Sequence, residues 1–326
     1  MRYDPEKQKK HKWKIKPTLL SIITVNYNGY EDTCQMIESI QKHLKSVGYE
    51  IIVIDNASTK DEAYLLHKRF PLIRIVSSSE NKGFAGGNNL GIPWAIGKYI
   101  LFLNNDTYIT EDHFQGLIDT LESSDDIAAV SPLIRYANEE DQPIQFAGFT
   151  PLSRFTLRNQ SIGNGQLVSD EYLVKKEIPY LHGAAMLVKK KVIQETGLMP
   201  ETYFLYYEEI DWSISMTQMG YKLYYEPCCT VYHKESRSTG VDSPLKVFFM
   251  MRSRFLFAYR NRNWMERKIC FLYLLLLVFP RDCFKYLFNR RFDLILASIK
   301  GILSYFMMNK TEKLDNNEFK FSYLWP

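Results

Sequence analysis

The stretch at residues 99–107, "YILFLNNDT", decides the fold. Five residues suited to a buried strand run directly into two amides and a carboxylate, Asn104, Asn105 and Asp106. A strand that is apolar at every position is typical of a sheet covered on both faces, because a half-exposed strand would alternate polar and apolar residues. The polar end is either a turn that stops the strand or part of a site that holds a charged ligand.

On either side of this stretch, short apolar runs alternate with amphipathic ones. Strands are predicted at 19–25, 50–55, 73–78, 99–103, 127–133, 181–190 and 221–227, and helices over roughly 31–46, 60–70, 85–97, 111–123 and 191–197, with a further helix after the acidic residues near 208. The alternation predicts an α/β fold with a mostly parallel, doubly wound sheet and helices on both faces. The less periodic residues 134–180 are predicted as irregular strands and loops that form a flap over the site.

Ligands of such sheets bind outside the carboxyl ends of the strands. Each of the first four predicted strands ends on polar residues, namely Asn26-Tyr27-Asn28, Asp55-Asn56, the segment 80–83 and Asn104-Asn105-Asp106. One polar loop says little, since Asn favours turns. Four that meet at one edge of a sheet indicate a ligand site.

Asp106 is the candidate ligand for a divalent cation at this edge. Mg²⁺ and Mn²⁺ take few protein carboxylates and complete their coordination with phosphate oxygens and water, so an acid among polar loops suits a metal–diphosphate ligand. His233, after the last predicted strand, could add a nitrogen, although a single His is more often structural.

Glu208, Glu209 and Asp211 form the densest acidic cluster next to apolar sequence. They are candidates for a general base, which must lie within reach of a substrate hydroxyl. The alternative is a helix whose first-turn acids complement its dipole. The neighbouring aromatic residues favour a pocket, since such rings stack on sugars; they are Tyr203, Phe204, Tyr206, Tyr207 and Trp212.

Composition excludes some classes of protein. The net charge of +4 is mild, and the basic residues flank apolar runs, so nucleic-acid binding is disfavoured. Five cysteines without metal-ligand spacing, and no apolar leader at the N-terminus, favour reduced thiols in a cytoplasmic protein.

The positive charge is concentrated in residues 1–16 and 244–291. The apolar run at 269–279 has eleven residues, fewer than the ~20 that a membrane-spanning helix needs. Two interpretations stay open. The run forms either an interfacial helix near anionic lipid, which would attach the protein to the inner face of the cytoplasmic membrane, or a core helix that packs on the rest of the chain.

Seven segments, taken together and in order, resemble family 2 glycosyltransferases, and in particular the bacterial rhamnosyltransferase-like enzymes of surface polysaccharide assembly. The match spans about residues 18–260. Its segments are "SIITVNYNGYEDTCQMIESI", "IIVIDNAS", "ENKGFAGGNNLGI", "YILFLNNDT", "LHGAAMLVKK", "YFLYYEEIDWSISMTQMGYKLYYEP" and "VYHKESRS".

The resemblance implies a GT-A fold and an inverting transfer from a nucleoside-diphosphate sugar, a dTDP- or UDP-sugar, to a hydroxyl of a glycan or lipid-linked oligosaccharide. It implies that Asp106, with His233, holds Mg²⁺ or Mn²⁺, and that Glu208-Glu209 matches a Glu-Asp pair whose second member is the base. The donor contacts that it implies are Thr24, Asn26, Asn28, Asp55, Lys82, Gly83, Asn89, Asn104 and Asn105.

Two residues depart from the family pattern. Asn104 stands where the DXD-type motif has its first Asp, which leaves one carboxylate for the metal. Glu209 stands where the base is usually Asp, so Glu208 and Asp211 stay open as alternatives. Two other functions also stay open, a sugar nucleotidyltransferase and a non-catalytic nucleotide- or glycan-binding module.

The expected organisation has three parts. A basic tail (1–17) precedes a catalytic domain (18–243), whose nucleotide-binding half (18–133) is followed by an acceptor half (134–243). A helical, basic and aromatic extension (244–326) ends the chain.

Overall fold

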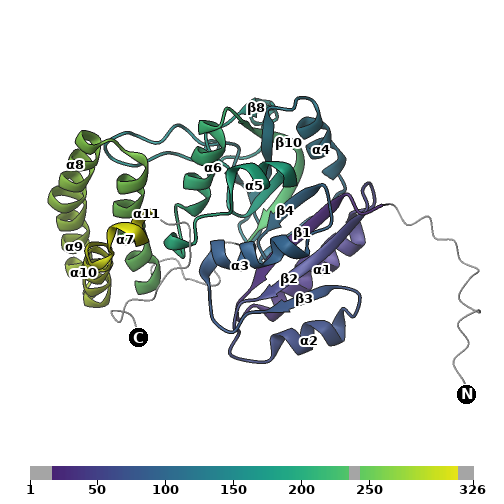
Figure 1. The fold of residues 1–326 in the computed structure, drawn as a ribbon, viewed down its shortest axis with the longest axis horizontal. Helices are drawn as coiled ribbons and strands as arrows, with labels where there is room; N and C mark the ends of the chain where they lie inside the picture. Colours follow the sequence, from purple (N-terminus) through teal and green to yellow (C-terminus); the bar gives the residue numbers. More distant parts are fainter. Residues whose placement is uncertain (1–16, 235–242, 315–326) are drawn as a thin grey trace, which may run out of the picture.

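The computed structural model describes residues 17–234 and 243–314. The predicted basic tail therefore lies outside the described residues except for Pro17, as do residues 315–326 of the predicted extension. Figure 1 shows a twisted sheet with helices around it and a separate group of helices from the C-terminal part of the chain.

The sheet has the strand order β3-β2-β1-β4-β9-β6-β10-β5. Its first four strands are parallel, as predicted, and they are β1 (Leu20–Asn26), β2 (Tyr49–Asp55), β3 (Arg74–Ser77) and β4 (Tyr99–Leu103). β6 (Ile127–Tyr136) and β10 (Lys222–His233) are parallel to each other, and β9 (Ala185–Lys189) runs antiparallel between β4 and β6. Both predicted halves of the catalytic domain thus contribute to one mostly parallel sheet.

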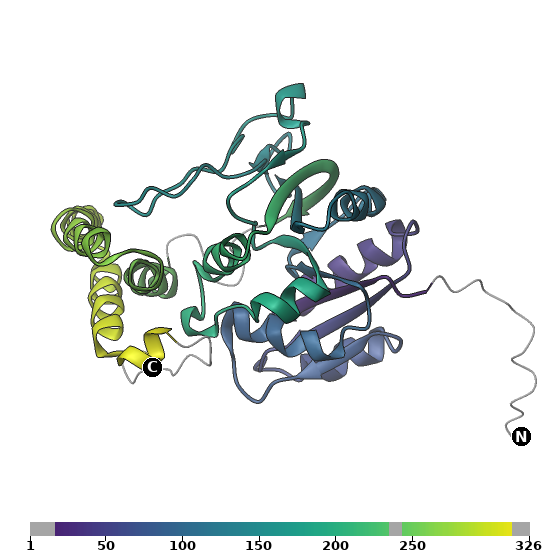
Figure 2. The ribbon, with the colours of Figure 1, turned by 45° about the horizontal axis from the view of Figure 1, so that its top comes forward.

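Three short strands complete the sheet: β5 (Thr107–Tyr108), β7 (Ile144–Phe146) and β8 (Lys176–Glu177). Helices lie on both of its sides, as Figures 1 and 2 show. They are α1 (Tyr30–His43), α2 (Glu62–Arg69), α3 (Gly83–Gly91), α4 (Phe114–Glu122), α5 (Lys190–Thr196) and α6 (Glu208–Gln218). The predicted α/β fold is confirmed.

The strand predicted at 181–190 spans only Ala185–Lys189, and two other predicted boundaries are wrong for a reason that involves proline. The helix predicted over 85–97 ends at Gly91 and continues only as a 3₁₀ turn over Ile92–Trp94, because Pro93 has no N–H for a helical hydrogen bond. The strand predicted at 221–227 continues to His233. It passes Pro227 through a register shift between Glu226 and Thr230, which leaves the proline outside the ladder.

The C-terminal part is helical, as predicted: α7 (Pro244–Asn261), α8 (Trp264–Tyr273), α9 (Phe279–Phe288), α10 (Phe292–Met307) and α11 (Lys310–Leu314). A π-helical turn, Leu274–Val278, joins α8 to α9. Within residues 17–234 and 243–314, no helix combines the length and apolar character needed to cross a membrane. In the run 269–279, Cys270, Leu274 and Val278 are buried, whereas Leu272 and Leu276 are exposed. On one side, the run therefore packs on the rest of the chain, as a core helix would. Its other side is exposed.

Candidate active site

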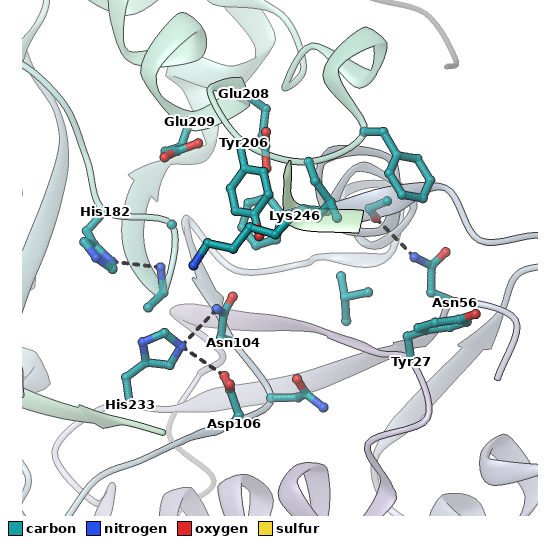
Figure 3. Close-up of a pocket in the computed structure, with 18 of the residues that line it drawn as sticks. Tyr27, Asn56, Asn104, Asp106, His182, Tyr206, Glu208, Glu209, His233 and Lys246 are labelled. Atoms are coloured by element: carbon teal, nitrogen blue, oxygen red, sulfur yellow. Dashed lines mark hydrogen bonds and ion pairs between the residues drawn. The ribbon is translucent and has the colours of Figure 1, made fainter. Parts of the chain in front are cut away.

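A cavity of about 390 Å³ lies at the carboxyl edge of the sheet (Figure 3), a size suited to a small-molecule ligand. It brings together seven of the predicted site residues, Gly83, Asn104, Asn105, Asp106, Glu208, Glu209 and His233. The polar end of β4 thus opens into a ligand-sized cavity, as expected if it is more than a turn.

Asp106 and His233 form the floor of the cavity as a buried pair. β5 follows Asp106 directly and pairs with the end of β10, where His233 lies opposite Thr107. This pairing places Asp106 Oδ1 3.1 Å from His233 Nε2. Burial opposes ionisation of Asp106, but the hydrogen bond and the charge of His233 outweigh it, so the pKa of the carboxyl lies below its usual value.

A second residue orients the His233 ring. Gln145 Oε1 lies 2.8 Å from His233 Nδ1 and accepts a hydrogen bond from its N–H, while the Asn104 side-chain amide lies 3.4 Å from Nε2. Nε2 faces the same space as the Asp106 carboxylate, and it would offer its lone pair to a cation bound there in place of the proton that it shares with Asp106. An imidazole held through its other nitrogen beside a carboxylate is a donor set that fits Mn²⁺ or Mg²⁺. The described residues contain no group of three or more His, Cys, Asp or Glu that could hold a metal.

Glu208 and Glu209 enter the cavity from the opposite side, as the first two residues of α6. The loop before them has Phe204, Tyr206 and Tyr207 at φ of 66°, 67° and 78°. Bulky residues rarely adopt this left-handed conformation, and such strain gathers at functional sites where the surroundings hold it. Here Phe204 O accepts a hydrogen bond from Phe84 N at 2.9 Å.

The two carboxyl groups differ in their ionisation. Burial raises the pKa of Glu209 to about 7. Burial, with a smaller contribution from the negative charge of Glu209, raises the pKa of Glu208 well above its usual value. Two adjacent buried carboxyl groups do not both ionise readily. At a pH at which Glu209 has lost its proton, Glu208 therefore keeps its own. Glu209 therefore has the ionisation that suits a base near neutral pH.

Asp211, the third predicted base, does not line the cavity. Its carboxylate is buried, pairs with the Arg260 guanidinium of α7 and accepts a hydrogen bond from Asn261 Nδ2 at 2.9 Å. It joins α6 to the C-terminal helices and is placed to stabilise the fold.

Replacing Asp211 by Ala should therefore lower the free energy of unfolding by about 3 kcal/mol, because it removes the carboxylate that pairs with the mostly buried Arg260 guanidinium. Turnover at a temperature where the variant is folded should stay near that of the wild type. Urea denaturation and initial rates would measure the two effects. The double variant Asp211→Leu/Arg260→Met is the control, since removing both charges should restore most of the stability. Normal stability with lost turnover would instead identify Asp211 as the base.

The other predicted nucleotide contacts do not line the cavity. Asn26 donates to Asp55 Oδ1 and Glu62 Oε2, at 2.9 Å each, and accepts from Thr33. It therefore connects the ends of β1 and β2 without lining the cavity. Asn89 donates to Met199 O and Glu201. The remaining ones are Thr24, buried in β1; Asn28, which accepts from Thr59 N; and Lys82, which pairs with Glu80.

Sequence reasoning missed several residues of the cavity wall. Tyr27 and Asn56 lie there, as the strand-end pattern predicted, although the family resemblance did not name them as donor contacts. His182 and Lys246 also line the cavity. Lys246 lies on α7, more than a hundred residues beyond the DXD-type motif, and its side chain extends into the cavity (Figure 3). No sequence signal marked it.

A sheet of this topology, with an Asn-Asn-Asp turn on one side of a carboxyl-edge cavity and paired acids on the other, is the arrangement of a GT-A glycosyltransferase. Residues 21–197, more than half of the chain, match the family model described as "Glycosyl transferase family 2". The chain belongs to the family 2 glycosyltransferases.

Similar proteins agree with this family. The chain is 26% identical, over 92% of its length and 95% of the relative's, to the low-salt glycan biosynthesis hexosyltransferase Agl10 of Haloferax volcanii. It is 24% identical, over 66% of its length and 76% of the relative's, to the N-acetylglucosaminyl-diphospho-decaprenol L-rhamnosyltransferase of Mycobacterium tuberculosis. These relatives support the predicted rhamnosyltransferase-like type and favour glycosyl transfer over the two alternative functions.

Among solved structures, GalNAc-T7, crystallised with UDP, GalNAc and Mn²⁺, has a similar fold, with a TM-score of 0.56 at 15% identity. The similarity covers 74% of this chain and about half of that one, 50%. At this identity it supports the fold alone.

Proposed function

We propose that the protein transfers a hexosyl group, with inversion, from a dTDP- or UDP-sugar to a hydroxyl of a lipid-linked glycan in the synthesis of a surface polysaccharide. The observation that carries the proposal is the placement of two opposed groups around one cavity. Asp106 and His233 line one side, and Glu208 and Glu209 line the other. A displacement with inversion needs this arrangement, with the leaving group and the base on opposite faces of the sugar.

The donor's diphosphate would lie over Asp106, His233 and Asn104. A divalent cation bound there supplies positive charge to the diphosphate as it leaves. Asp106 and His233 would hold this cation, and Gln145 would keep the His233 lone pair turned towards it. Asn104 contributes an amide instead of a second carboxylate, so the protein provides a single negative charge at this position.

Lys246 would add a fixed positive charge for the same diphosphate. It is the one Lys or Arg among the described residues that line the cavity, where Asp106, Glu208 and Glu209 are the acids. Ser243 caps the first turn of α7 by accepting from Lys246 N at 3.1 Å, which holds the backbone of the lysine in place. With only one carboxylate available for the metal, an ammonium group is well placed to compensate for the diphosphate charge.

Lys246→Met should therefore raise KM for the donor and lower kcat/KM by about 10²-fold, the usual loss when one charged contact to a developing anion is removed. Initial rates at varied donor concentration would measure it. Lys68→Met, at an exposed lysine of α2, is the matched control and should behave as wild type. Unchanged donor kinetics in Lys246→Met would show that Lys246 does not contact the diphosphate.

Glu209 would accept the proton of the attacking acceptor hydroxyl. Its carboxylate faces the cavity (Figure 3), and aromatic side chains that line the same cavity, including Tyr206 and Phe149, offer faces for a sugar ring. Since the proposed acceptor is lipid-linked, the reaction would take place at the cytoplasmic surface of a membrane.

The proposal is tested by thermal shift with dTDP- and UDP-sugars, with and without Mn²⁺, followed by transfer to a prenyl-diphosphate-linked sugar and assignment of the product anomer by NMR. A ligand that binds the folded state raises the melting temperature. We expect Mn²⁺-dependent stabilisation by one donor and a product of inverted configuration. Retained configuration would overturn the proposed mechanism.

A further inference from the structure

The C-terminal helices expose an apolar surface that nothing in the described structure covers. On the rod formed by α8, the π-turn and α9, the residues Ile269, Leu272, Leu276 and Phe284 recur at helical spacing and are all exposed, Leu276 at 66% and Phe284 at 73%. The other side of the same rod packs inward through Cys270, Leu274 and Val278. The rod is therefore apolar on its exposed side as well as on its buried side.

α10 continues this surface. Its residues Phe292, Leu296, Leu303 and Phe306 follow helical spacing and are exposed, while Ala297, Gly301 and Tyr305 face inward, and α10 packs along α7. The two stripes join at the short turn between α9 and α10, where Phe288 is 83% exposed. Figures 1 and 2 place these helices at the outer edge of the molecule, at the end away from β2 and β3. We call the exposed residues of α8, α9 and α10 the apolar face.

Positive charge borders the apolar face. Residues 264–310 contain eight Lys or Arg and three acids, and two of those acids, Asp282 and Asp293, are paired with Arg281 and Arg291. Trp264, which is exposed at the start of α8, adds a side chain that favours the boundary between water and hydrocarbon. An apolar helix side bordered by Lys and Arg is typical of helices that lie in the headgroup region of anionic membranes.

We propose that the apolar face docks the protein on an anionic lipid bilayer, with α8, α9 and α10 lying in its surface. A second copy of the chain is a poorer occupant. A two-fold contact through this face would bring its basic border against an identical one, and like charges in contact are unfavourable. A bilayer rich in anionic lipid satisfies both the apolar stripes and the basic border.

Docking would also orient the cavity. Arg252 of α7 is buried and donates to Thr202 O at 2.8 Å and Tyr203 O at 3.1 Å, just before the loop that leads to Glu208. Arg260 of α7 pairs with Asp211 of α6. α7 also carries Lys246 into the cavity and packs along α10, so the helices proposed to lie on the bilayer contact a helix that lines the cavity. This consequence rests on the proposed function, whereas docking itself does not.

The test is flotation of the full chain with vesicles of phosphatidylglycerol and phosphatidylcholine, compared with phosphatidylcholine alone. We expect the wild type to float with the anionic vesicles. The double variant Leu276→Glu/Phe284→Glu should bind them at least about tenfold more weakly, since burying a single Leu or Phe side chain is worth about a factor of ten. Leu72→Glu is the matched control, a substitution of an apolar residue 98% exposed in the turn between α2 and β3, and it should float as wild type does.

Three results would overturn the inference: wild type that stays in solution with anionic vesicles, equal flotation of the double variant, or a dimer in sedimentation velocity that the double variant dissociates while vesicle binding is unchanged. Thermal shift with donor sugars, measured on the same preparations, keeps the two proposals apart. Flotation without any donor binding supports docking and counts against the proposed function, and donor binding without flotation does the reverse.

Discussion

Glu209→Gln should reduce glycosyl transfer by about 10²–10⁴-fold, the usual contribution of a general base, and leave donor binding near that of the wild type. The amide keeps the shape of the side chain but cannot accept the acceptor's proton. Initial transfer rates would measure the loss of activity, and thermal shift with the donor would measure donor binding. Near-normal turnover in Glu209→Gln would show that another group is the base.

Glu208→Gln is the matched control for this variant. Burial and the charge of Glu209 keep Glu208 protonated, so an uncharged amide replaces an uncharged acid and transfer should fall by no more than about tenfold. If Glu208→Gln abolishes transfer and Glu209→Gln does not, the two roles are exchanged.

The pH dependence follows from the same pair. A base acts in its deprotonated form, and the pKa of Glu209 is raised to about 7, so the transfer rate should increase with pH as the pH passes through about 7 and level off above it. In Glu209→Gln the remaining transfer rate should no longer increase as the pH passes through about 7. If the variant keeps this increase, a group other than Glu209 is responsible for it.

Asp106→Asn should reduce transfer by at least about 10²-fold and remove the dependence of donor binding on Mn²⁺. Asp106 supplies the one carboxylate of the proposed metal site, and the variant leaves only neutral donors, the His233 ring and amides. Isothermal titration of the donor with and without Mn²⁺ would measure the loss.

Two further variants sharpen this experiment. Asp119→Asn, at an exposed acid of α4, should bind donor and Mn²⁺ as the wild type does. Gln145→Leu should weaken Mn²⁺ by about 10- to 100-fold, because it frees the His233 ring without removing a ligand. Mn²⁺-dependent donor binding that survives in Asp106→Asn would show that the metal does not bind at Asp106.

The pattern of apolar residues predicted the strands of the sheet, but it did not predict the exact ends of the strands and helices. Mostly apolar runs predicted β1, β2 and β4, because a strand buried on both faces is rich in apolar residues. The end of β10 was missed because Pro227 looks like a stop. The strand passes it through a register shift that depends on its neighbour β6, which no local pattern contains.

The sequence by itself determined the doubly wound sheet, the polar carboxyl edge and the acids at the start of α6, because period and strand-end chemistry are local properties. Only the tertiary structure decided which acid faces the cavity and which supports the fold. Glu209 and Asp211 are two residues apart on one helix, yet Asp211 forms an ion pair with Arg260 of α7, whereas Glu209 lines the cavity. The "NNDT" turn after β4 shows the same division. Its composition indicated a ligand site, but Asp106 acquires its partner His233 only because β5 pairs with the far end of β10.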